Sequence, residues 1–125
     1  MKHIFRNLLL LVALVGLLPL SVMAMTKGNT VNLTQAIQYS DQGFSKKPIF
    51  KGDAYTILLF AFKKGQQLHA HTIPIDAFIQ VLEGTATVII ADKEFEVAAG
   101  EKIDLPKNLP HALTAKENFK MLLVK

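Results

Sequence analysis

Hydrophobic and polar positions alternate over short stretches of the chain, and glycine or proline separates one stretch from the next. In residues 94–97, Phe95 and Val97 alternate with glutamates, a pattern typical of a strand with one face in water. Eight such stretches follow Gly43: AYTILLFAF, QQLHAH, DAFIQVLE, TATVIIA, EFEVAA, EKIDL, HALTA and FKMLLVK. Because no long helical pattern separates them, the sequence predicts an all-β fold, an antiparallel sandwich or barrel.

The segment before these strands, residues 25–43, is mostly polar and contains one helix signal. Asn32 is followed three residues later by Gln35, which is the spacing of a helix N-terminal cap. We therefore expect a short helix of at most about two turns within residues 25–43.

The first 24 residues have a targeting pattern. Lys2 and Arg6 precede an apolar run from Leu8 to Leu18, and the residues VMA end at Ala24. This pattern predicts a signal peptide, residues 1–24, and an exported protein that is periplasmic or secreted. The alternative is an uncleaved membrane anchor, although the run is shorter than the roughly 20 residues that a spanning helix needs.

The composition of the exported chain disfavours some classes of binding partner. Without Lys2 and Arg6, the count of Lys and Arg falls from 14 to 12 against 10 Asp and Glu, and the lysines are scattered. We therefore expect no nucleic acid binding. The chain has no cysteine, so no disulfide can stabilise the domain. After Arg6 it has no arginine, which disfavours substrates that need a bidentate clamp on a carboxylate or phosphate.

Three histidines are candidate metal ligands. His69 and His71 lie two residues apart in QQLHAH, so in a regular strand both imidazoles project from one face. A third histidine, His111, follows a predicted strand and a turn bounded by Pro106 and Pro110. The three histidines together predict one metal site.

With these histidines and the glycines and prolines around them, the sequence resembles the cupin superfamily, specifically the small single-domain cupins with a cupin 2 type conserved barrel. The residues that match its two motifs are Gly65, His69, His71 and Gly84 in the first, and Gly100, Pro106 and His111 in the second. The resemblance implies that residues 44–125 form a double-stranded β-helix, or jelly-roll barrel. It also implies a metal at the barrel mouth, bound by His69, His71, His111 and a carboxylate.

The chain departs from the cupin motifs in the spacer between Gly65 and His69, which has three residues instead of five, at Asn108, where glycine is usual, and at Ala115, where asparagine is usual. The main departure is the carboxylate, which is glutamate in the first motif. If four residues separate the carboxylate from His71, its position is that of Asp76. If six residues separate it from Gly84, its position is that of Ala77. Asp76 faces the metal only if the chain bulges after Pro74; otherwise it caps a turn or orients a histidine. Gln80 is a weaker candidate for the same role.

Spacing does not choose the metal. Three neutral imidazoles suit a divalent transition metal (Zn, Fe, Mn, Ni or Cu), and the missing glutamate disfavours Mn. The alternative is a barrel in which the histidines bind no metal.

The resemblance leaves the reaction open. We expect a metal-binding cupin that takes a small molecule in the barrel mouth, as a metal-dependent enzyme of oxygenase or isomerase type with Asp76 as base. The alternative is a non-catalytic module that binds a ligand or metal. A homodimer is expected through edge strands such as FSKKPIF or FKMLLVK.

Overall fold

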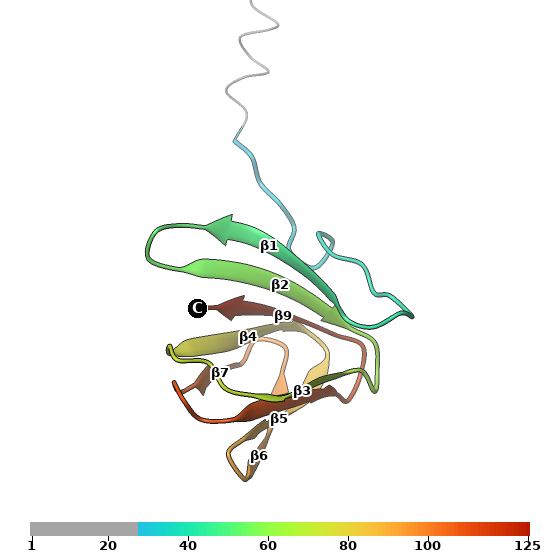
Figure 1. Ribbon diagram of the computed structural model, residues 1–125. Coiled ribbons are helices and arrows are strands. Elements are labelled where there is room, and N and C mark those ends of the chain that lie inside the picture. The colour runs from blue at the N-terminus through green and yellow to red at the C-terminus, as the bar shows by residue number, and fades with distance from the viewer. Residues whose placement is uncertain (1–27) are drawn as a thin grey trace, which may run out of the picture. The chain divides into compact units, whose positions relative to one another are not determined.

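A computed structural model describes residues 28–125, so the predicted signal peptide, residues 1–24, lies outside the described residues. Contacts place residues 32–125 in one compact unit, the second of two along the chain. Every strand of the described residues belongs to this second unit (Figure 1). In the part of the chain that the structure describes, no helix is long and apolar enough to cross a membrane.

Two antiparallel sheets make up the second unit. The five-stranded sheet has the order β1-β2-β9-β4-β7, and the four-stranded sheet has the order β3-β8-β5-β6. The strands are β1 (Ser45–Lys51), β2 (Thr56–Phe62), β3 (Gln67–His71), β4 (Ala77–Glu83), β5 (Thr85–Ile90), β6 (Lys93–Ala98), β7 (Lys102–Leu105), β8 (His111–Ala115) and β9 (Phe119–Val124).

The observed strands confirm the predicted all-β jelly roll. Each of the eight predicted stretches contains one strand, from β2 to β9. Strand β1 is additional and lies at an edge of its sheet, as expected for FSKKPIF. Its lysines, its proline and a register shift between Pro48 and Phe50 are features that discourage further strand pairing. The expectation that FKMLLVK is also an edge strand is wrong, because it forms β9, which pairs with β2 on one side and β4 on the other.

The short helix predicted within residues 25–43 is wrong for the residues described. Residues 33–37 form turns and bends instead. The cap signal is real, because Asn32 Oδ1 accepts the backbone N–H of Thr34 at 3.1 Å. The backbone bonds from Gln35 and Ala36 nevertheless reach back only three residues, as in a turn. Ile37 packs against the outer face of β2, and this contact favours the turn over a helix.

The same segment is joined to the outer face of the five-stranded sheet by polar contacts. Tyr39 donates its hydroxyl to Glu83 Oε2 at 2.5 Å, and the ammonium of Lys120 lies 4.8 Å from the centre of the Tyr39 ring. Burial, with the Glu83 carboxylate beside it, raises the pKa of Tyr39. Lys120 is buried and also donates to the carbonyl of Thr34, which explains how the sheet tolerates a buried ammonium.

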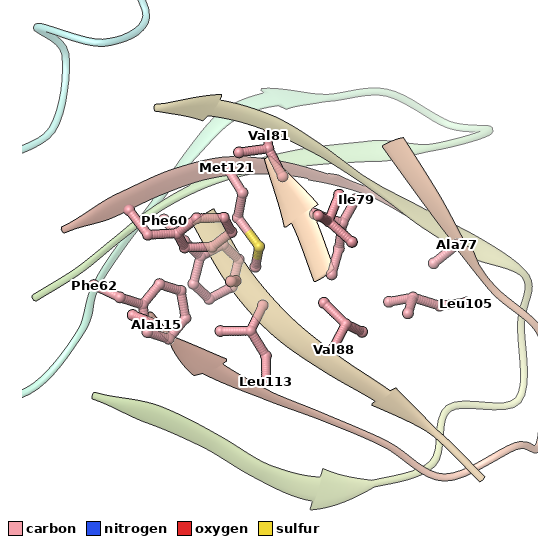
Figure 2. Close-up of a cluster of buried hydrophobic side chains, with 13 residues drawn as sticks. Phe60, Phe62, Ala77, Ile79, Val81, Val88, Leu105, Leu113, Ala115 and Met121 are labelled. Atoms are coloured by element: carbon pink, nitrogen blue, oxygen red, sulfur yellow. The ribbon is translucent and has the colours of Figure 1, made fainter. Parts of the chain in front are cut away.

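The main core lies between the two sheets. Figure 2 shows the side chains that fill it, which come from both layers. Alternate residues of each strand point inward, so that Phe60 and Phe62 of β2 lie in the core while Leu59 and Ala61 face the opposite side. The alternation seen in the sequence therefore explains which face of most strands is buried.

Candidate functional site

Strand β8 places His111 inside the barrel. It pairs with β5 in an unbroken antiparallel register from Ala86↔Ala115 to Ile90↔His111. Along β8, His111, Leu113 and Ala115 are buried and alternate with half-buried residues. His111 is only 5% exposed, so the imidazole belongs to the interior of the barrel.

On its other side β8 pairs with β3, and there the register shifts. Leu68 lies opposite Leu113 and His71 lies opposite His111, so three residue steps on β3 match two on β8. The extra residue is a β-bulge. Because of it, Leu68 and His71 both line the inner cavity, although they are three residues apart.

The bulge overturns one expectation. His69 and His71 were expected on one face of a regular strand, but His69 is exposed and does not line the cavity that His71 lines. Instead, the backbone carbonyl of His69 accepts a hydrogen bond from Nδ1 of His71 at 2.9 Å. In this structure His69 supports the ring of His71 through its main chain.

His71 and His111 form a pair. Their ring centroids are 4.4 Å apart with an interplanar angle of 63°, an edge-to-face arrangement. Nδ1 of His111 contacts the carbonyl of Leu109 at 3.3 Å, as Nδ1 of His71 contacts that of His69. A carbonyl oxygen only accepts, so in both rings Nδ1 carries the proton and Nε2 keeps its lone pair. The pair therefore offers two acceptor nitrogens.

The protein favours the neutral form of His111. Burial lowers the pKa of His111 below its ordinary value, and the neighbouring His71 acts in the same direction. The hydrogen bond to Leu109 opposes these effects but does not outweigh them. A neutral imidazole is the form that binds a metal ion or accepts a hydrogen bond from a ligand.

The two rings lie at a small, mostly apolar cavity of about 60 Å³. Its other walls are Leu68, Ile73, Ile79, Val88, Leu105, Ala112, Leu113, Met121, Leu123 and Lys125. This volume accepts only a small group, because liquid water occupies about 30 Å³ per molecule. A larger chamber of about 580 Å³ shares Leu105 and Lys125 with it. A ligand with a small apolar end and a larger polar body fits this pair of spaces.

Asp76 is turned away from the histidine pair. It precedes β4, whose inward face begins with the buried Ala77, and its Oδ1 accepts the backbone N–H of Lys107 at 3.0 Å. The expected metal ligand therefore joins two loops, which is the turn-capping alternative. Ala77 holds the inward position of the motif carboxylate and has no oxygen to offer.

Gln80 also fails as a ligand. It is exposed and lies between the buried Ile79 and Val81 on β4, so its side chain is on the outer face of the sheet. That face is the one away from the cavity.

The loop before β8 is held by the segment after β3. The backbone N–H of Asn108 donates to the carbonyl of Ile73 at 2.8 Å, beside the bond from Lys107 to Asp76. Asn108 stands where the motif usually has glycine and has a φ of +64°, a conformation that asparagine tolerates better than most residues. These contacts fix the loop whose Leu109 carbonyl holds His111.

The residues present fit the expected metal only in part. Within residues 28–125, no group of three or more His, Cys, Asp or Glu side chains is arranged to hold one metal ion. The predicted set of His69, His71, His111 and Asp76 is therefore not assembled. His71 and His111 do fit as two ligands, because each ring is fixed by a hydrogen bond at Nδ1, as metal-binding histidines usually are.

Sequence reasoning missed two parts of the site. Ile73 and Lys125 line the cavity beside the histidines, but no motif contains them. Lys125 is nevertheless the first charged residue after the apolar run MLLV, so its place at the open end of an inward-facing strand could have been inferred. For Ile73, which lies in a loop, the sequence carries no such signal.

Comparisons with known proteins agree with this geometry. The family model described as "Cupin domain" matches residues 58–125. A conserved protein of unknown function from Streptococcus pyogenes has a similar structure, with 33% identity, a TM-score of 0.72, and coverage of 78% of this chain and 86% of its own. A cupin 2 conserved barrel domain protein from Leptotrichia buccalis has 35% identity and a TM-score of 0.71, over 75% of this chain and 46% of its own.

A more distant similarity is that to KdgF from Halomonas sp., with 17% identity and a TM-score of 0.67 over 79% of this chain and 92% of that one. At this identity the likeness shows the fold alone. The comparison with curated proteins gave no match.

Proposed function

Because the chain belongs to the cupin family, we propose that it is an exported binding protein that holds a small ligand at the His71–His111 end of its barrel. The observation that carries this proposal is the pair of imidazoles beside an apolar cavity, both held at Nδ1 by a backbone carbonyl. Binding is favoured over catalysis because Asp76, the expected base, lines the larger adjoining space and not the cavity at the two histidines, and its Oδ1 already accepts a backbone hydrogen bond.

We further propose that a divalent transition metal is part of the ligand set. His71 and His111 would hold it, and its remaining coordination positions would be filled by the bound molecule or by water. When bound, the metal would supply Lewis-acid coordination of the ligand. Two neutral imidazoles and no carboxylate favour Cu, Ni or Zn over Mn.

Export and dimer formation complete the proposal. Export rests on the pattern of residues 1–24, and the dimer rests on the edge position of β1. Because the lysines, the proline and the register shift of β1 discourage strand pairing, its side chains would make the contact between copies. A mature N-terminus at Met25 in the exported protein, measured by mass spectrometry, would support cleavage. An intact Met1 in a membrane fraction would favour the uncleaved anchor.

Calorimetric titration with Zn²⁺ or Ni²⁺ tests the site, using chain 25–125 without a histidine tag. We expect about one equivalent bound, with binding lost in His71→Ala and in His111→Ala. His69→Ala is the matched control, and it should bind within about threefold of the wild type. Loss of binding in all three variants would instead restore the three-histidine site, through a rearrangement of the bulge. Unchanged binding in His111→Ala would exclude the pair.

A further inference from the structure

A second concave surface lies where the two sheets end. Strand β6 is the last strand of one sheet and β7 is the last strand of the other, and no ladder joins them in the described part of the chain. A groove of about 540 Å³ opens between them, which we name the β6–β7 groove. Its apolar walls are Ile90, Phe95, Val97, Ile103, Pro106 and Leu109. The volume falls within the range of sites for small molecules.

The walls are exposed because the sheets are open here. Phe95 lies opposite Val88 and so shares the inward face of its sheet, yet it is 41% exposed. No strand lies beyond β6 to cover it. Leu109 across the groove is also 41% exposed. Two large apolar side chains facing one groove leave surface that a ligand can remove from water.

Backbone hydrogen bonds close the groove at both ends. At one end, Ala99 N–H donates to Gly84 O at 3.0 Å and Gly100 N–H donates to Val81 O at 2.9 Å, which joins the turn after β6 to β4. At the other end, Ala91 N–H donates to Pro110 O at 2.7 Å. The groove is therefore a bounded site rather than a continuous unpaired edge.

Charges line the rim, and carboxylates outnumber ammonium groups. The acidic residues are Asp92, Glu96, Glu101 and Asp104, and the basic residues are Lys93 and Lys102. Lys102 is already paired with Asp104 at 2.6 Å, and Glu96 is paired with Lys116. The remaining rim charges are the carboxylates of Asp92 and Glu101 and the ammonium of Lys93. The groove therefore complements a molecule with an apolar body and a positively charged head.

The groove shares a wall with the histidine site. Leu109 lines the groove with its side chain, while its carbonyl contacts Nδ1 of His111 at 3.3 Å. Ile90, another wall residue, lies directly opposite His111 in the β5–β8 ladder. A ligand that moves Leu109 would therefore change the setting of the His111 ring.

We propose that the β6–β7 groove is a second binding site, for a small amphipathic cation, and that its occupancy is transmitted to His111 through Leu109. The apolar body of the ligand packs between Phe95 and Leu109, and its ammonium lies among the rim carboxylates. This site is distinct from the cavity of the proposed function and does not depend on a metal being bound there.

The test uses three probes of similar shape: 2-phenylethylamine, 2-phenylethanol and 3-phenylpropionate. Each is titrated into ¹⁵N-labelled chain 25–125 without metal, and binding is followed by NMR. We expect the amine to bind with a dissociation constant of about 1 mM, the alcohol more weakly and the anion most weakly. The largest changes in chemical shift should occur at backbone amides of residues that line the groove. The side chain of His111 should shift, while the exposed His69 should not.

Matched variants locate the site. Phe95→Ala should weaken the amine roughly tenfold through lost apolar contact, and Asp92→Asn should weaken it by roughly two- to fivefold, as expected for an exposed charge pair. Phe50→Ala and Asp53→Asn, at exposed positions of the β1–β2 hairpin, are the controls and should change nothing. Leu109→Ala should reduce the His111 shift more than it reduces binding.

Several outcomes would overturn the proposal. If no binding is detected up to about 20 mM amine, well above the expected dissociation constant, the groove is not a binding site for this class of ligand. An equal loss of amine affinity in the groove variants and in their controls would show that the amine binds elsewhere. Equal binding of the anion would refute the class of ligand, and an unmoved His111 at saturation would refute the transmission. None of these results bears on metal binding by His71 and His111, so the two proposals fail separately.

Discussion

Strand β8 has two neighbours, and its pairing with them differs. With β5 it forms a continuous register that ends at Ile90↔His111, and strict alternation describes both strands. With β3 the register shifts between Leu68 and His71. The regular side places His111 in the interior, whereas the bulged side leaves both His69 and Ala70 away from the cavity. One extra residue thus decides that His71, and not His69, lines the cavity.

Core truncations should show the largest difference between the two sides. Leu113→Ala, at a position 2% exposed and opposite both Val88 and Leu68, should cost about 2–5 kcal/mol of unfolding free energy. Leu68→Ala, half-buried on the bulged strand, should cost about 1–2 kcal/mol. Urea unfolding measures both. Equal losses would show that the bulged strand is packed as firmly as the regular one.

The loop contact on the bulged side should matter next. Asp76→Ala removes the acceptor for the backbone N–H of Lys107, so stability should fall by about 1–2 kcal/mol. Asp53→Ala, an exposed control in the β1–β2 hairpin, should stay within about 0.5 kcal/mol of the wild type. Metal binding by Asp76→Ala should be retained. A loss of metal with unchanged stability would make Asp76 a ligand after all.

Substitutions to glycine should change the unfolding free energy in opposite directions on the two sides of β8. Ala91, in the turn after β5, has a φ of +55°, which glycine adopts without strain. Ala91→Gly should therefore stabilise the protein by about 0.5–1 kcal/mol, measured in urea. Ala70 lies in the bulge and is not among the residues with positive φ. Ala70→Gly should destabilise by a similar amount, and a gain there would mean that the bulge is strained.

The pH dependence should give the smallest effect. Burial lowers the pKa of His111 from its ordinary value of 6.5, so below that pH the unfolded chain binds more protons than the folded one. The contribution of His111 is thus complete above pH 6.5 and is lost as pH falls through the lowered pKa. Compared with the wild type, His111→Gln should lose less stability between pH 7.5 and roughly pH 5. A steeper slope in His111→Gln would reverse the sign.

Some parts of the site could be predicted because they depend on local rules. Alternation accounts for the burial of Phe60, Val88 and Leu113, and His111, a residue of the second motif, is buried as well. Asp76 shows the limit of this approach, since counting from two different anchors gave two different residues. The structure resolves the conflict, because Ala77 points inward and Asp76 faces the neighbouring loop.

The sequence by itself determined the all-β antiparallel class, because two-residue periodicity and turn residues act locally, and the resemblance to the cupins added the jelly roll. It also determined the family, through glycines, prolines and histidines at characteristic intervals. Only the tertiary structure decided which histidines meet, because a bulge depends on how β3 packs against β8 and leaves no periodic signal. The same holds for the β6–β7 groove, whose walls come from strands that become neighbours only when the two sheets face each other.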